Sequence, residues 1–198
     1  MPRSQRICQP NLTYHVFSRC IEYKELLDVH TKDILLSILR RTQKKYSFDL
    51  IHYTIMSNHF HFIIRTVDEG APISRIMQYI KSRLAETYNR LMNRIGPFWN
   101  ERFKDVIIEK QDNPTRYLLW LLWYMGYNPV RKGHVKCPEQ YKYCSINCYL
   151  LENFYVPVKI TFHEYFIDLG STFKERVRRF RQWEEMYRKR YALHFDYS

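Results

Sequence analysis

The sequence is short of glycine, of paired cysteines and of long uncharged stretches, and each shortage argues against a class of protein. It has five glycines and no Gly-rich phosphate loop, which argues against a P-loop or dinucleotide site. The longest uncharged stretch, residues 117–130, is too short to span a bilayer, and residues 1–11 contain no apolar signal segment. Five scattered cysteines, an odd number, indicate free thiols in a reducing cytoplasm. We therefore expect a cytoplasmic protein without a membrane partner.

Positive charge and aromatic side chains, by contrast, are abundant. The 198 residues include 32 Lys and Arg against 20 Asp and Glu, giving a net charge of +12. An excess of this size makes a polyanion the first partner to consider. The chain also carries 12 Phe, 17 Tyr and 4 Trp, and aromatic rings can stack on unpaired bases while cations hold the phosphates. The alternative is a basic globular protein with an aromatic core.

The pattern of apolar residues predicts a mixed α+β domain. Helical spacing is clearest over residues 73–95, where apolar residues recur at steps of three and four and Gly96-Pro97 follows. The predicted order is strand 12–18, helix 28–46, strands 48–56 and 59–66, helix 73–95, strand 103–110 and helix 115–127. Pro129 should end the last helix at Asn128. This order predicts an antiparallel sheet of the split βαβ pattern with helices on one face.

The character of the chain changes after residue 150, so we predict a domain over 1–150 and a helical extension over 151–198. Between Lys174 and Arg190 there are eight basic and three acidic residues, alongside apolar residues at helical spacing. This pattern indicates a basic amphipathic helix. Arg178 and Arg179 are candidates to hold a nucleic acid through its phosphates. The alternative is an extra helix that packs on the domain.

The segment His59-Phe60-His61 is the first candidate for chemistry. Residues i and i+2 of a strand point to the same face, so two imidazoles can chelate one divalent metal while Phe60 faces the other way. The alternative is a pair of polar residues on a solvent-facing sheet, because two histidines do not complete a coordination shell. Five other histidines are expected to be structural or surface residues: His15, His30, His52, His163 and His194.

Tyr124 and Asn128 form the second candidate for a catalytic or metal-binding site. At positions i and i+4 of a helix they share a face. Tyr124 could act as a nucleophile, with Asn128 offering an amide oxygen to a metal beside it. The alternative is an ordinary core tyrosine in an apolar helix.

Five segments, in order, resemble the HUH-class single-tyrosine transposases, and within them the REP-associated tyrosine transposase branch. The residues 56–62 resemble the segment that contains the HUH motif, with Ser57 in place of the usual proline. The residues 98–103 resemble a Trp-Gln-x-Arg-Phe element, and 124–131 a Tyr-Ile-x-x-Asn-Pro-Val-Arg element. The other two matching segments are 14–19 and 138–145. The resemblance covers about residues 10–150, and the sequence beyond residue 150 resembles no element of the family.

The resemblance implies a ferredoxin-like enzyme that cuts and joins single-stranded or hairpin DNA without ATP. Tyr124 would attack the scissile phosphate to form a 5′-phosphotyrosine and release a 3′-OH. His59, His61 and Asn128 would bind Mg²⁺ or Mn²⁺, although related transposases often have Gln at the position of Asn128. A metal there would neutralise charge on the non-bridging oxygens, which agrees with the chemistry of the residues themselves.

Several arginines are candidates to contact DNA. Arg102 and Arg131 lie inside matching segments, and Arg75 and Arg83 lie on the basic side of the 73–95 helix. The alternative for the helix residues is an ordinary solvated face. Two other functions remain open: a non-catalytic module that binds hairpin DNA or RNA, and a metal-dependent nuclease that uses water. The protein is expected to be a monomer or a homodimer.

Overall fold

The computed structural model describes residues 9–195, with side chains described for 9–191, and its elements follow the predicted order. The strands are β1 (Thr13–Arg19), β2 (Phe48–Ile55), β3 (His59–Thr66) and β4 (Lys104–Ile107). The helices are α1 (Val29–Lys45), α2 (Ile73–Leu91), α3 (Pro114–Arg131), α4 (Glu164–Ile167) and α5 (Phe173–Phe195). Short 3-10 turns cover Ile21–Tyr23, Ile108–Lys110, Pro138–Gln140 and Ser145–Tyr149.

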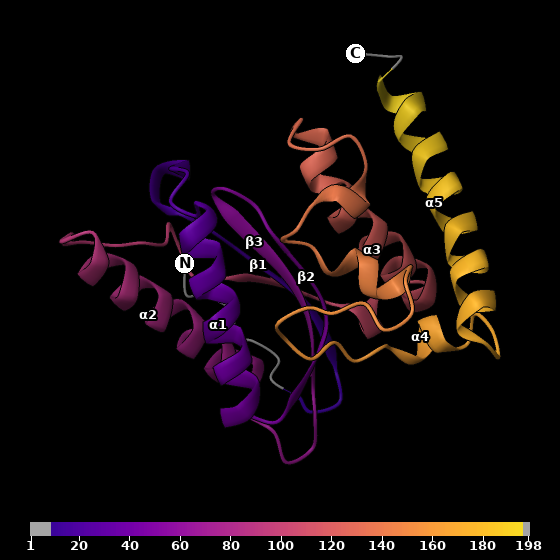
Figure 1. Ribbon diagram of the computed structural model, residues 1–198. Coiled ribbons are helices and arrows are strands. Elements are labelled where there is room, and N and C mark those ends of the chain that lie inside the picture. The colour runs from indigo at the N-terminus through magenta and orange to yellow at the C-terminus, as the bar shows by residue number, and fades with distance from the viewer. Residues whose placement is uncertain (1–8, 196–198) are drawn as a thin grey trace.

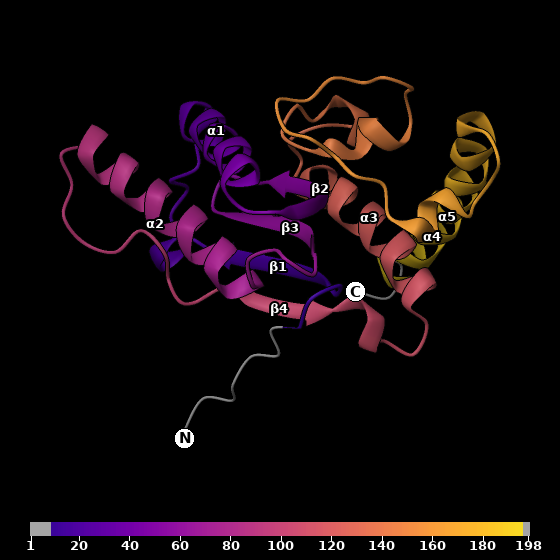
Figure 2. The same ribbon diagram turned by 90° about the horizontal axis from the view of Figure 1, so that it is seen from below.

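The four strands form one antiparallel sheet in the order β2-β3-β1-β4. Consecutive strands β2 and β3 are joined directly through Ser57-Asn58, whereas β1 reaches β3 and β4 only across helical connections. The register between β1 and β3 pairs Phe17 with His61 and His15 with Ile63. This is the predicted split βαβ arrangement (Figure 2).

Helices cover both faces of the sheet. The two helices of the split βαβ unit, α1 and α2, lie together on one face, as predicted, and α3 lies over the other (Figure 1). Alternation along β3 sends Phe60 and Phe62 to one face and His61 to the opposite face, where it meets the ring of Tyr124 on α3. Cover on both faces explains why nearly every residue of β2 and β3 is buried. The histidines therefore face α3 rather than open solvent.

The prediction that α3 ends at Asn128 is wrong, because the helix continues through Pro129 to Arg131. A proline inside a helix leaves the carbonyl four residues earlier without its N–H partner, here the carbonyl of Met125. The hydroxyl of Thr54, on β2, donates a hydrogen bond of 3.2 Å to that carbonyl. A distant strand thus compensates the backbone group that Pro129 leaves unpaired.

Two predicted ends also differ from the structure. The helix α2 ends at Leu91 rather than Ile95, and Ile95 is 98% exposed. Strand β4 stops at Ile107, and residues 108–110 form a 3-10 turn instead.

The C-terminal helix α5 packs along α3 (Figure 1). The indole N–H of Trp123 donates to the carbonyl of Phe180 at 3.0 Å, and the two rings stack with centroids 4.6 Å apart. The hydroxyl of Tyr127 donates to Glu184 at 2.7 Å. These contacts attach α5 to the helix that carries Tyr124; the division into 1–150 and 151–198 stays a prediction.

Within residues 9–195 no helix is long and apolar enough to cross a membrane. The cysteines that the structure describes, Cys20, Cys137, Cys144 and Cys148, carry free thiols.

Candidate active site

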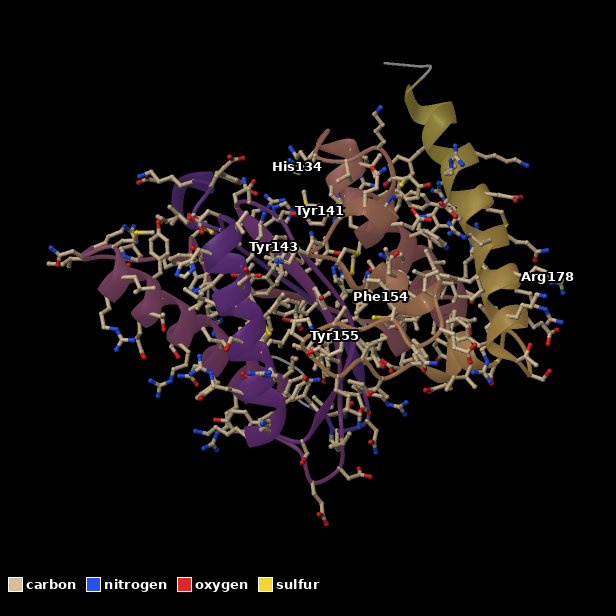
Figure 3. The ribbon with its side chains drawn as sticks, viewed as in Figure 1. His134, Tyr141, Tyr143, Phe154, Tyr155 and Arg178 are labelled. Carbon is tan, nitrogen blue, oxygen red and sulfur yellow. The ribbon has the colours of Figure 1, made fainter. Side chains whose placement is uncertain are left out.

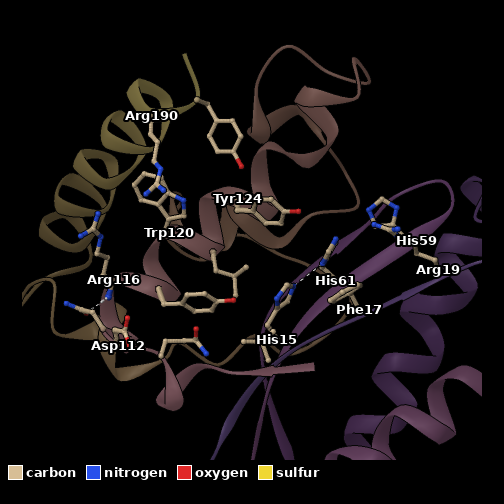
Figure 4. Close-up of a pocket in the computed structure, with 16 residues that line it drawn as sticks. His15, Phe17, Arg19, His59, His61, Asp112, Arg116, Trp120, Tyr124 and Arg190 are labelled. Atoms are coloured by element: carbon tan, nitrogen blue, oxygen red, sulfur yellow. Dashed lines mark hydrogen bonds between the residues drawn. The ribbon is translucent and has the colours of Figure 1, made fainter. Parts of the chain in front are cut away.

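An open pocket of about 1040 Å³ lies between the histidine-bearing face of the sheet, α3 and α5 (Figure 4). The sheet contributes residues of β1, β3 and β4, and the opposite wall comes from the start and middle of α3 and from the end of the described part of α5. The residues that line the pocket include His15, Phe17, Arg19, His59, His61, Asp112, Arg116, Tyr117, Trp120, Tyr124, Arg190 and Tyr191.

His59 and His61 stand side by side in this pocket, with ring centroids 5.2 Å apart. The Nδ1 atom of His59 lies 2.6 Å from the side-chain oxygen of Asn58, to which it donates. The Nδ1 atom of His61 is hydrogen-bonded to Nε2 of His15 at 2.9 Å. With both Nδ1 atoms engaged, neither Nε2 has a hydrogen-bond partner among the described residues. The Nε2 atom of His59 can therefore offer its lone pair to a cation, and the Nε2 atom of His61 can do so in the tautomer whose Nδ1–H donates to His15.

Burial keeps these imidazoles neutral. Loss of solvent lowers the pKa of His59 to about 4, and the nearby charges of Arg19 and Lys132 act in the same direction. Burial also lowers the pKa of His61 well below its usual value, helped by the neighbouring His15 and His59. A neutral imidazole is the form that binds a metal. At neutral pH the pair is therefore in the protonation state that a metal site would need.

His15 is a pocket residue that sequence reasoning grouped with structural or surface histidines. Its ring stacks on His61 with centroids 5.1 Å apart, and its side chain is buried. The signal for its position was the first matching segment, 14–19, because residue 15 shares a strand face with residue 17, which pairs with His61. His52 and His163 are buried elsewhere, His30 is exposed, and the side chain of His194 lies outside the described residues.

Tyr124 reaches the histidines from the opposite wall. Its ring lies edge-on to His61, with centroids 6.1 Å apart and planes at 89°. The guanidinium of Arg131 lies 4.6 Å from the centroid of the Tyr124 ring and donates a 3.2 Å hydrogen bond to the Tyr124 carbonyl. The fold thus brings together a phenol and two imidazoles that are more than sixty residues apart in the chain.

Asn128 is not brought to the histidine pair. It is buried, does not line the pocket, and its side-chain oxygen accepts a hydrogen bond from Arg131. Its side-chain NH₂ is buried and makes no hydrogen bond within the described part of the chain. In that part, moreover, no three His, Cys, Asp or Glu side chains are grouped to hold a metal. Two neutral imidazoles fit a divalent cation, and the other ligands would come from water or a phosphate.

The predicted DNA-contacting arginines lie outside the pocket. Arg102 is exposed on the loop before β4, and Arg131 is engaged internally by Asn128 and the hydroxyl of Tyr187. Arg75 and Arg83 are exposed on α2, across the sheet from the histidines. The guanidinium of Arg75 lies 5.9 Å from the Tyr46 ring centroid, and Arg83 pairs with Glu86 at 2.9 Å.

On α5, Arg178 points outward from the body of the protein (Figure 3), and Arg179 pairs with Glu175 at 2.8 Å. The pocket instead contains Arg19, Arg116 and Arg190. Arg116 was not singled out from the sequence. Arg116 lies eight residues before Tyr124, slightly more than two helical turns, and this spacing could have predicted that both side chains lie on the same side of α3.

Comparisons with known proteins place the chain in a family. The model of the family described as "Transposase IS200 like" matches residues 8–117, which is more than half of the chain. The chain therefore belongs to the IS200-like transposases, as the resemblance of its motifs predicts. The matched stretch contains both histidines and ends before Tyr124.

Two individual relatives agree with this assignment. A protein of Haemophilus influenzae named "Putative REP-associated tyrosine transposase" is 22% identical over 120 residues, which cover 56% of this chain and 66% of that protein, just under two thirds of its length. The solved structure of a REP-associated tyrosine transposase bound to a REP hairpin superposes with a TM-score of 0.62 at 18% identity, covering 81% of this chain and 92% of that one. At this identity the superposition confirms the predicted α+β fold.

Proposed function

We propose that the protein is a metal-dependent transposase that nicks and rejoins single-stranded DNA through a 5′-phosphotyrosine on Tyr124. One observation carries the proposal: the Tyr124 ring lies 6.1 Å, centroid to centroid, from His61, in the pocket that also holds His59. A nucleophile beside a pair of neutral imidazoles is an arrangement that suits metal-assisted phosphoryl transfer.

The proposed reaction exchanges one phosphate ester for another. The phenol oxygen of Tyr124 attacks the scissile phosphorus, the bond from phosphorus to the 3′ oxygen breaks, and that oxygen leaves as a 3′-OH after taking a proton. The phosphotyrosine preserves the ester, so rejoining needs no nucleotide. A free tyrosine has a pKa of about 10 and must lose its proton to attack.

The side chains of the pocket account for binding and orientation. His59 and His61 would hold Mg²⁺ or Mn²⁺, which would neutralise the charge that develops on the non-bridging oxygens. Arg131 contacts both the ring and the carbonyl of Tyr124, so it limits the directions in which the phenol can point. We therefore assign Arg131 to positioning Tyr124. Asn128 keeps a metal-ligand role only if its side chain leaves Arg131.

Hairpin-containing DNA is the substrate that we propose. The structural relative was solved bound to a REP hairpin, and the net charge of +12 favours a polyanion. The exposed arginines predicted from the sequence stay candidates to contact phosphates outside the pocket, on two separate sides of the molecule: Arg75 and Arg83 on α2, Arg102 on the loop before β4, and Arg178 and Arg179 on α5.

The test is formation of a covalent adduct. A labelled hairpin with single-stranded flanks, incubated with the protein and Mn²⁺, should give a protein–DNA species that survives SDS. Tyr124→Phe should abolish the adduct and retain DNA binding, whereas Tyr155→Phe, at a tyrosine that is 81% exposed and outside the pocket, should leave it intact. His59→Ala and His61→Ala should each remove metal-dependent cleavage.

The outcomes separate the competing functions. An adduct that persists in Tyr124→Phe would show that another residue is the nucleophile. Cleavage without any adduct would favour a nuclease that uses water, and hairpin binding without cleavage would favour a non-catalytic module.

A further inference from the structure

The pocket extends well beyond the space that a scissile phosphate needs. Figure 4 shows Trp120 between Tyr124 and Arg116, with Asp112 at the far end from the histidines. Arg116 precedes Tyr124 by eight residues, which is about 12 Å along a helix axis. Because a stacked strand advances about 3.4 Å per nucleotide, this length accommodates about two to three nucleotides beside the one that is cut.

Tyr117 is the unusual residue along this wall. It lies seven residues before Tyr124, so both side chains project from the same side of α3 into the pocket. The ring of Tyr117 has no ring or cation partner among the described residues, and its hydroxyl makes no hydrogen bond there. The other aromatic rings of the middle of α3 are all engaged: Trp120 with Tyr187, Trp123 with Phe180, Tyr124 with His61 and Tyr127 with Tyr187. Tyr117 is thus a half-buried ring that packs in part against the core and turns its remaining surface to the pocket, where a ligand can contact it.

The charges around this ring suit a nucleic-acid strand. Arg116 and Arg190 both line the pocket, are exposed, and form no ion pair within the described part of the chain. The guanidinium of Arg190 lies 5.5 Å from the Trp120 ring centroid. Among the lining residues the one carboxylate is Asp112, at the outer end, where it can accept a hydrogen bond from an exocyclic amino group of a base.

We propose that Tyr117, with Trp120 beside it, forms a stacking site for an unpaired base close to the scissile phosphate, while Arg116 and Arg190 hold the neighbouring phosphates. The inference rests on the proposed function, because it places the cut at Tyr124. Aromatic rings bind bases of any sequence by stacking, and cations fix the strand between them. The site would therefore set which nucleotides reach Tyr124 rather than carry out the chemistry.

The experiment couples a change in the DNA to a change in the protein. Single abasic nucleotides are placed in turn at the three positions on each side of the scissile phosphate. Binding of the labelled hairpin is measured by fluorescence anisotropy in a Tyr124→Phe background, which prevents cleavage. At one position the missing base should weaken binding by about 5- to 150-fold, the usual effect of losing one base–aromatic stack. Adding Tyr117→Ala should remove that penalty.

Two control variants keep the result interpretable. Tyr117→Phe retains the ring and should retain the penalty, whereas a variant that merely damages the protein would weaken binding of the intact and the abasic hairpin alike. Tyr155→Ala, at an exposed aromatic outside the pocket, should also retain the penalty. Equal penalties with and without the Tyr117 ring, or no penalty at any of the six positions, would overturn the inference.

The adduct assay separates this inference from the proposed function. If Tyr124 forms the adduct but Tyr117→Ala leaves the abasic penalty unchanged, the stacking site alone is refuted. If Tyr117→Ala removes the abasic penalty but no adduct forms, the stacking site stands and the nicking reaction is refuted.

Discussion

His52 should make the fold sensitive to acid. It is fully buried on β2, with Nδ1 2.7 Å from the hydroxyl oxygen of Ser145 and Nε2 3.7 Å from the sulfur of Cys144. Burial, with a smaller contribution from His15, lowers its pKa from 6.5 to about 3. The folded protein therefore holds His52 neutral over a range in which the unfolded chain takes up a proton.

The direction and size of the effect follow from this difference. Between pH 6.5 and about 3 the unfolded state binds more protons than the folded state at His52, so the free energy of unfolding falls as the pH falls. Each pH unit below 6.5 removes about 1.4 kcal/mol, so the loss is about 1.4 kcal/mol at pH 5.5 and about 2.7 kcal/mol at pH 4.5. A loss of this size is large beside the 5–15 kcal/mol that typically holds a domain folded.

The assay is urea denaturation at pH 7.5, 5.5 and 4.5, followed by tryptophan fluorescence. Other buried histidines contribute to the same loss, so the difference between wild type and His52→Gln isolates His52. From pH 7.5 to 5.5 the wild type should lose about 1.4 kcal/mol more than His52→Gln. His134→Gln, at an exposed histidine, should behave like the wild type. Parallel losses in wild type and His52→Gln would refute the reasoning.

Three further predictions concern α5 and its contacts. Phe180→Ala should lower the free energy of unfolding by about 3–5 kcal/mol in urea, because the buried ring stacks on Trp123; a loss below 1 kcal/mol would contradict this packing. Tyr187→Phe removes the hydroxyl that accepts from Arg131, so single-turnover adduct formation should slow while hairpin affinity stays constant; an affinity change instead would show a DNA contact. Arg178→Ala should reduce the slope of log affinity against log salt by about one, and an unchanged slope would place Arg178 off the DNA.

The order of the elements could be predicted because it depends on local patterns. Apolar spacing in α2 and the strand-forming residues of β2 and β3 are properties of neighbouring residues in the chain. The end of α3 could not be predicted in the same way. The hydroxyl that pairs with the Met125 carbonyl comes from Thr54, about seventy residues earlier, and only the fold brings it there.

The candidate site shows the same division between local and distant information. The placing of His59 and His61 on one face follows from the two-residue period of a strand, and the motif drew attention to Tyr124. The hydrogen bond between His15 and His61 depends on the register of two strands that are far apart in sequence. The engagement of Arg131 depends on a tyrosine of α5, so sequence reasoning assigned that arginine to DNA.

Arg131 connects the C-terminal helix to the proposed nucleophile. Its guanidinium donates to Tyr187 on α5, lies 5.0 Å from the ring centroid of Tyr191, also on α5, and lies 4.6 Å from that of Tyr124. A displacement of α5 would therefore change the surroundings of Tyr124 without touching the histidines. Because α5 also supplies Arg190 to the pocket, residues beyond 150 contribute to the wall along which we propose that DNA lies. The extension that sequence patterns separate from the domain thus acts, in the folded protein, as one side of its candidate active site.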